Sequence, residues 1–137
     1  MAADHVNINA FLCCDKIIVE AENNKKTVVG IFRNFSFQQL PSVFGAPWFI
    51  FAQMSSLDAG PHTVTVNIAH DETVGVVFAA GAEIAPEFPG GDIDLVLPAQ
   101  PAQFQKQGKH VVTLNIDGQQ KAYYVLTVQL GASQIGG

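Results

Sequence analysis

The sequence predicts an all-β domain, an antiparallel β-sandwich of about eight strands that is jelly-roll or immunoglobulin-like, with a β-barrel as the alternative. Three observations support this prediction. Fifteen Val and ten Ile residues outnumber eight Leu residues, and β-branched side chains suit a pleated sheet better than a helix. Apolar and polar residues alternate with period two in several segments, which is typical of strands with one solvated face. Turn residues separate these segments at short spacing, as antiparallel hairpins require.

The elements follow in order along the chain. We expect strands at Phe11–Glu20, Thr27–Phe37, Trp48–Met54, His62–His70, Val74–Ile84, Asp92–Leu97, Lys109–Asp117 and Lys121–Leu130. Asp117-Gly118 lies between two alternating segments and is the strongest hairpin signal. Glu22–Lys25 and Asp71-Glu72 predict two further hairpins.

Two segments differ from the alternating pattern. Trp48–Met54 and Val74–Ile84 are apolar at nearly every position, which predicts strands buried on both faces, as a two-sheet core requires. The connections Leu40–Pro47, Pro86–Gly91 and Pro98–Gly108 contain proline and are too long for tight hairpins. We therefore expect them to cross between the sheets.

The length of 137 residues predicts one sandwich domain over residues 1–137, with residues 130–137 as a flexible tail. Hydrophobic residues make up 48% of the chain and charged residues only 14%, which excludes intrinsic disorder. The net charge is −5 and Lys and Arg are scattered, which argues against nucleic acid as a partner.

No apolar run is long enough to span a bilayer, so we expect no membrane insertion. The first residues do not have the pattern of a secretory signal, so we expect a cytoplasmic protein. The two cysteines, Cys13 and Cys14, are neighbours, which excludes a disulfide framework and a four-cysteine zinc site within one chain. They are expected to be reduced thiols in a strand, one of them facing the core.

The densest polar cluster predicts the one candidate ligand site. His70, Asp71 and Glu72 follow one another, and Asp92 and Asp94 project from one face of a later strand. Several carboxylate oxygens at the loop end of a sandwich can hold Ca²⁺, although this spacing matches no specific calcium motif. Turn chemistry and solvated strand faces explain the same residues. We therefore predict no cofactor and no catalytic residue.

Three histidines share the parity of buried positions at strand ends. His62 and His70 lie at opposite ends of one strand, and His110 precedes the inward Val112. Each is either a ligand or acid–base group, or a polar residue at the rim of the core. A rim residue is the simpler interpretation, because histidine carries chemistry only with partners.

Asp15 interrupts an apolar strand. Its parity either points it inward to a hydrogen-bonding partner or marks a bulge, and Arg33 is a possible charge partner on the adjoining strand. Gly30, in the middle of that strand, predicts a bulge or a close approach of backbone.

Phe11–Glu20 reads FLCCDKIIVE and Lys26–Phe32 reads KTVVGIF, similar to a "CDK-hydrophobic" strand followed by a "K-x-hydrophobic-x-G-hydrophobic-F" strand. In these motifs the chain resembles a family of small uncharacterised bacterial all-β domains. Phe104–Val111 (FQKQGKHV) and Asn115–Gly118 (NIDG) are similar to the closing hairpin of that family. The resemblance implies one all-β domain of unknown function and no catalytic residues.

These observations favour a non-enzymatic protein that acts by association, as a self-assembling homo-oligomer or an accessory module for a protein partner. The excess of apolar over charged residues supports this hypothesis, and sheet edges are the expected docking surfaces. The alternative is a metal- or small-ligand-binding sandwich built on the loop-end histidine and carboxylates. A weaker hypothesis is carbohydrate binding by Trp48, Tyr123 and Phe88, although Trp48 has the pattern of a core residue.

Overall fold

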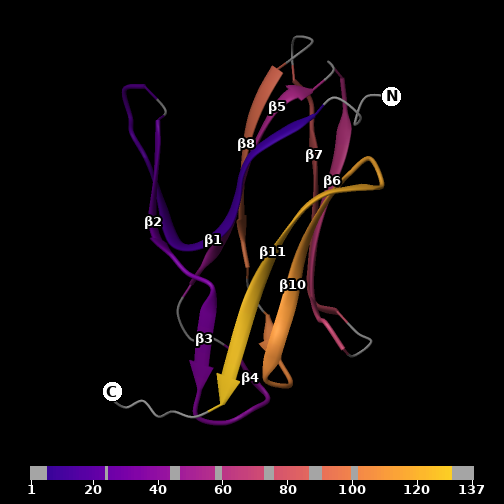
Figure 1. Ribbon diagram of the computed structural model, residues 1–137. Helices are drawn as coiled ribbons and strands as arrows, with labels where there is room; N and C mark the ends of the chain where they lie inside the picture. Colours follow the sequence, from indigo (N-terminus) through magenta and orange to yellow (C-terminus); the bar gives the residue numbers. More distant parts are fainter. Residues whose placement is uncertain are drawn as a thin grey trace.

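The computed structural model of the chain (Figure 1) describes residues 6–23, 25–43, 47–57, 60–72, 76–86, 91–99 and 102–130. Its strands are β1 (Asn7–Val19), β2 (Lys26–Ile31), β3 (Asn34–Phe37), β4 (Ser42–Val43), β5 (Phe49–Leu57), β6 (His62–His70), β7 (Val76–Ile84), β8 (Gly91–Pro98), β9 (Gln103–Phe104), β10 (Gly108–Ile116) and β11 (Gln119–Leu130). In these residues there is no helix that is long and apolar enough to cross a membrane. The tail predicted at 130–137 lies outside the described residues, except for Leu130 at the end of β11.

The strands form two main layers. The smaller sheet has the order β2-β1-β5-β8, and the larger sheet has the order β3-β11-β10-β6-β7. Strands β4 and β9 form a separate two-stranded sheet. Every pairing is antiparallel except that of β3 with β11, which is parallel. The prediction of an all-β fold built from two layers is therefore confirmed.

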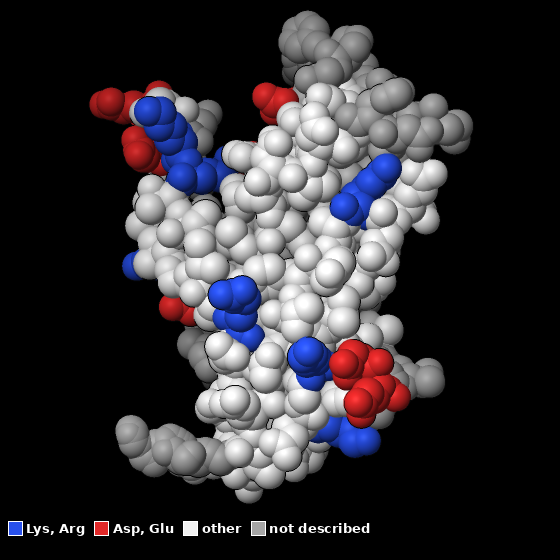
Figure 2. Space-filling view, in the orientation of Figure 1, with Lys and Arg blue, Asp and Glu red and all other residues white. Residues whose placement is uncertain are grey.

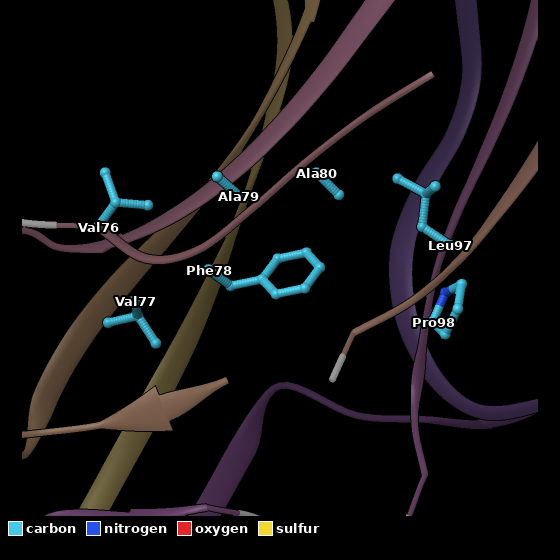
Figure 3. A pocket seen from close by; sticks show the side chains of 7 residues that line it. All are labelled: Val76, Val77, Phe78, Ala79, Ala80, Leu97 and Pro98. Atoms are coloured by element: carbon cyan, nitrogen blue, oxygen red, sulfur yellow. The ribbon is translucent and has the colours of Figure 1, made fainter. Parts of the chain in front are cut away.

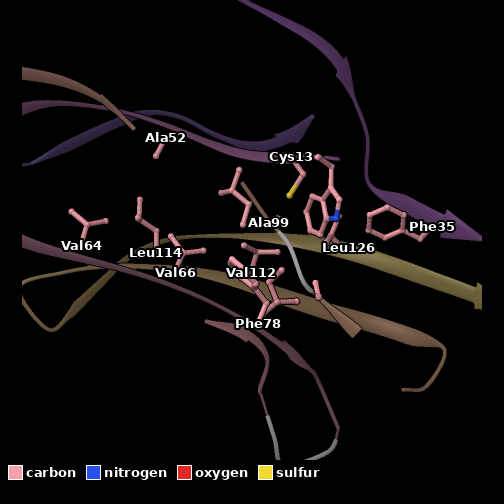
Figure 4. Packing of buried hydrophobic residues seen from close by; sticks show 14 of the residues in the cluster. Cys13, Phe35, Ala52, Val64, Val66, Phe78, Ala99, Val112, Leu114 and Leu126 are labelled. Carbon is pink, nitrogen blue, oxygen red and sulfur yellow. The ribbon is translucent and has the colours of Figure 1, made fainter. Parts of the chain in front are cut away.

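The hydrophobic core lies between the two sheets. Ile50 and Met54 of the smaller sheet and Val66, Ile68 and Leu114 of the larger sheet have at most 1% of their surface exposed. Figure 4 shows side chains from both sheets, such as Cys13 and Leu126, meeting in this layer. The alternating residues predicted to face inward on β6 and β10 are the ones that fill the core, as a period of two requires.

The predicted turns and crossings explain the connectivity. Hairpins join β1 to β2, β6 to β7 and β10 to β11, and all three predicted proline-containing connections pass from one sheet to the other. The strand expected over Thr27–Phe37 is in fact two, because the chain crosses between the sheets at Phe32 and Arg33. The crossing is held by Tyr124, whose Oη donates a hydrogen bond to the carbonyl oxygen of Phe32 at 2.7 Å.

One expectation about burial is wrong. Val74–Ile84 was expected to be buried on both faces, but the described part, β7, pairs only with β6 and forms an edge of the larger sheet. Phe78 faces the core, while Val76 is 60% exposed and Ala79 is also exposed. Trp48–Met54 behaves as predicted, because β5 lies between β1 and β8.

Strand β1 pairs with two neighbouring strands. Its first half, Asn7 to Cys14, pairs with β5, and its second half pairs with β2. The second half and β2 therefore extend past β5 as a two-stranded arm, which Figure 1 shows turning away from the rest of the sheet. At its base Asp15 lies against Gly30, where a Cβ atom would collide with the carboxylate and where φ is +73°.

The two motifs that carry the family resemblance thus meet at this contact. The close approach predicted at Gly30 is confirmed. Asp15 is exposed rather than inward, and no ion pair joins it to Arg33 in the described structure.

The arm shields the outer face of the smaller sheet. Phe51 alternates with the core residues Ile50 and Ala52, so it points outward, yet only 5% of it is exposed. On this side Lys26 of the arm forms an ion pair with Asp94 of β8 at 3.1 Å. Charged side chains gather at the tip of the arm (Figure 2), so this face is both covered and bordered by charge.

Candidate functional site

The five predicted site residues do not form one site. His70, Asp71 and Glu72 lie at the end of β6 in the larger sheet, whereas Asp92 and Asp94 lie exposed on β8 in the smaller sheet. Asp94 is instead paired with Lys26. No three His, Cys, Asp or Glu side chains in the described part of the chain are placed to hold a metal ion together.

His70 lies beside a small cavity of about 340 Å³. The cavity is lined by His70, Asp71, Glu72, Gln107, Gly108 and Lys109. The ring of His70 has a partner at each nitrogen: Nε2 lies 3.0 Å from the carbonyl oxygen of Gln107, and Nδ1 accepts a hydrogen bond from the backbone N–H of Glu72 at 3.1 Å. A carbonyl can only accept, so Nε2 carries the proton. With both nitrogens engaged, the ring has no free lone pair for a metal or a substrate proton.

Gly108 makes this arrangement possible. Its φ is +125°, and a Cβ atom there would lie 2.9 Å from Nε2 of His70. Only glycine adopts this backbone conformation without strain. The loop at this end of the sheet is therefore held in place by the close packing of Gly108 against His70.

His110 faces His70 from the neighbouring strand and is completely buried. Its ring meets the edge of the His70 ring at a centroid distance of 5.0 Å and that of Phe104 at 5.2 Å. Nδ1 donates to the carbonyl oxygen of Gly108 at 3.1 Å, and Nε2 has no hydrogen-bond partner. Burial lowers the pKa of His110, with a smaller contribution from His70 in the same direction, so the ring is held neutral.

A histidine–carboxylate pair at the opposite end of the same strands was missed by the sequence analysis. Nδ1 of the buried His62 lies 2.7 Å from a carboxylate oxygen of Asp117, and the other oxygen accepts the backbone N–H of Thr63 at 3.0 Å. The hydrogen bond from His62 lowers the pKa of Asp117. One signal for this pair was available. Strands β6 and β10 have the same length, so their antiparallel register places the Asp-Gly turn beside His62.

The residues considered for carbohydrate binding are separated. Trp48 is 1% exposed and packs edge-on against Phe35, with ring centroids 5.2 Å apart. It is therefore a core residue. Tyr123 is 64% exposed on the larger sheet, and Phe88 lies outside the described residues.

A second concave surface lies between the free edges of the two sheets. A groove of about 660 Å³ separates β7 from β8 and is lined by Val76, Val77, Phe78, Ala79, Ala80, Leu97 and Pro98. Figure 3 shows the Phe78 ring and the Leu97 side chain projecting into the space between the two strands. Every lining side chain is apolar, so this groove suits binding rather than acid–base chemistry. We call it the edge groove.

Two solved structures are similar to the chain at low sequence identity. The alkylpurine DNA glycosylase AlkC of Pseudomonas fluorescens, bound to DNA containing an abasic site analog, matches 90% of this chain and 30% of its own, at 10% identity and a TM-score of 0.53. A β-glucosidase of Listeria innocua in complex with glucose matches 91% of this chain and 16% of its own, at 11% identity and a TM-score of 0.46. This chain thus spans less than a third of either protein.

The curated proteins include no match to this chain. A family model, "Family of unknown function (DUF6941)", matches residues 9–129. This range contains the arm, both sheets and the edge groove. The chain therefore belongs to this family of unknown function, in agreement with its resemblance to an uncharacterised all-β domain.

Proposed function

We propose that this domain is a non-enzymatic binding module that takes up an extended segment of a partner protein by strand addition at β7. The observation that carries the proposal is the edge groove: an open sheet edge beside a continuous apolar hollow. An edge strand offers backbone N–H and C=O groups that a further strand can pair with.

The composition of β7 supports this role. From Val76 to Ala82 the strand carries no charged residue and no proline, and its first charge is Glu83. Edge strands of monomeric proteins are commonly protected by lysine, proline or a bulge in the exposed stretch. Here the single register shift lies at the Val76 end, and the pairing with β6 is regular from Phe78 to Ile84.

The lining of the groove indicates the chemistry of the segment. In strand addition the backbone supplies affinity, and pockets for alternate side chains supply specificity. Phe78 and Leu97 offer apolar surface on the groove side of the edge, and its volume falls within the range of about 300–1,000 Å³ typical of ligand sites. We expect an uncharged segment with apolar side chains at alternate positions.

The test is selection from a displayed library of random eight-residue peptides, followed by NMR mapping of the selected peptide. We expect enriched peptides to be uncharged and alternating, with the largest shift changes at amides of β7 and β8. Val77→Lys and Pro98→Lys place a charge in the groove and should weaken binding at least about tenfold, which is about 1.4 kcal/mol.

Thr27→Lys is the matched control, because it adds the same charge to an exposed position on the arm. It should bind the peptide as the unmodified protein does. The proposal fails if no peptide is enriched, or if the groove variants bind as tightly as the control.

A further inference from the structure

The outer face of the larger sheet carries an apolar row that crosses four strands. Val76 pairs with Ala69, Ala69 with Val111, and Val111 with Val125. Paired residues lie on the same side of a sheet. Because the alternate positions, such as Ile68, fill the core, the row points to solvent. We call these four residues the apolar row.

The row is bordered by an aromatic ring and by small polar side chains. Tyr123, 64% exposed, pairs with Thr113, which in turn pairs with Asn67. The next outward positions are Thr65 and Asn115, which pair with each other. These residues are uncharged, whereas Lys109, two residues before Val111 on the same side of β10, borders the row with a charge and lies beside Asp71. Figure 2 shows that uncharged residues cover the middle of the surface over β10 and β11.

The two sheets therefore present opposite kinds of outer face. The arm covers the face of the smaller sheet, which also carries Asp92 and Asp94. In the described structure, no arm or loop lies across the outer face of the larger sheet as the arm does on the smaller sheet. An exposed surface with an apolar centre, a tyrosine and a mostly uncharged polar border has the composition of a protein interface.

We infer that this face is a self-association surface, on which a second copy of the chain packs its own apolar row. A two-fold contact brings the same surface together twice, and the uncharged centre of this face can meet its copy without repulsion although the chain carries a net charge of −5. Two sheets packed in this way lie about 10 Å apart, with their strands at about 30°. The inference concerns a different surface from the edge groove and does not depend on strand addition.

The size of the face predicts the strength of the dimer. Four strands spaced about 4.8 Å apart and nine residues long, at about 3.3 Å per residue, give a projected area of about 600 Å². Stable interfaces bury about 800 Å² per partner, and most crystal contacts bury less than about 400 Å². The dimer is therefore expected to be weak and to form in a concentration-dependent manner.

Sedimentation equilibrium of the full chain, from low micromolar to near-millimolar concentration, tests this inference. We expect a reversible monomer–dimer equilibrium. Val111→Lys puts a charge at the centre of the apolar row and should raise the dissociation constant at least about tenfold. Tyr123→Lys should act in the same direction, and it is the safer variant because the side chain is largely exposed and does not support the core.

Thr27→Lys on the arm is again the control and should dimerise like the unmodified chain. A chain that stays monomeric up to near-millimolar concentration would overturn the inference. So would dimers that persist in both Val111→Lys and Tyr123→Lys. If Val77→Lys alone abolishes the dimer, the copies meet at their β7 edges, and the apolar row is not the interface.

Discussion

The two ends of the β6–β10 ladder differ in how they satisfy buried polar groups. At the end with the Asp117-Gly118 turn, His62 is matched by a carboxylate at 2.7 Å. At the other end, His70 and His110 pack ring against ring, and Nε2 of His110 lacks a partner. One end is thus held by a histidine–carboxylate hydrogen bond, and the other by close packing of two imidazole rings.

The two glycines of these turns show the same difference. Both adopt positive φ, +82° at Gly118 and +125° at Gly108. Around Gly118 nothing lies within 4 Å of an added Cβ, whereas at Gly108 the His70 ring occupies that space. The open turn depends on backbone conformation alone, and the packed turn also depends on the absence of a side chain.

The largest expected effect is that of Gly108→Ala. The strained φ costs about 1–3 kcal/mol, and displacing His70 breaks its bond to Gln107, which adds about 1 kcal/mol. The free energy of unfolding in denaturant should fall by about 2–4 kcal/mol. Gly118→Ala, the matched variant, should cost only about 1–2 kcal/mol. Equal losses would contradict the role assigned to the His70 contact.

Asp117→Ala tests the end held by the histidine–carboxylate hydrogen bond and should cost about 2 kcal/mol, since it removes hydrogen bonds from His62 and Thr63. Asp117 has φ of +52°, a conformation that Asn tolerates. Asp117→Asn therefore keeps the turn, removes only the charge and should cost about 1 kcal/mol. Urea unfolding of both variants measures the difference. If Asn is as damaging as Ala, the charge of Asp117 accounts for the whole effect.

The smallest effect is the response of the two ends to acid. The folded protein holds His110 neutral, with a lowered pKa, whereas the unfolded chain protonates this residue near pH 6.5. The unfolded state binds the proton first, so stability is complete above pH 6.5 and falls below it. At pH 6 the loss is under about 1 kcal/mol. The Asp117 carboxylate, whose pKa is lowered, contributes stability that remains until the pH falls below its ordinary value of 3.8.

Unfolding free energies between pH 8 and pH 3 separate these contributions. His110→Leu should flatten the decline that begins at pH 6.5 and leave the decline below pH 3.8 unchanged. Asp117→Asn should do the reverse. Declines of the same shape in both variants would show that other groups dominate the acid response. The groups closest to His110 are His70, Asp71 and the carbonyl of Gly108.

Much of the fold could be predicted from local pattern. Alternation identified which residues of β6 and β10 face the core, and the Asp-Gly pair correctly located the hairpin that joins β10 to β11. The prolines marked the crossings between sheets, because proline interrupts ladder pairing. These signals are local, and a single sequence contains them in full.

The order of the strands was harder to predict, because the alternation of apolar and polar residues along a strand does not identify the strands that lie beside it in the sheet. Val74–Ile84 was expected to be a strand buried on both faces, because an uncharged edge strand such as β7 has the same composition as an interior one. The parallel pairing of β3 with β11 joins segments about ninety residues apart, and no turn signal reports such a contact. For the same reason His62 and Asp117, which are distant in sequence, were judged separately as a rim residue and a turn residue.

The labelling rates of the neighbouring cysteines would measure how fast two parts of the molecule open. Cys13 faces the core and Cys14 the opposite side of the same strand, and neither has exposed surface. Burial raises the pKa of both thiols. Each thiol therefore reacts with an alkylating reagent only when the part of the structure that buries it opens. Cys14 lies where β1 pairs with both β2 and β5, so its labelling reports the separation of these strands, whereas Cys13 needs the two sheets to separate. Mass spectrometry of a labelling time course would thus record two motions from adjacent residues.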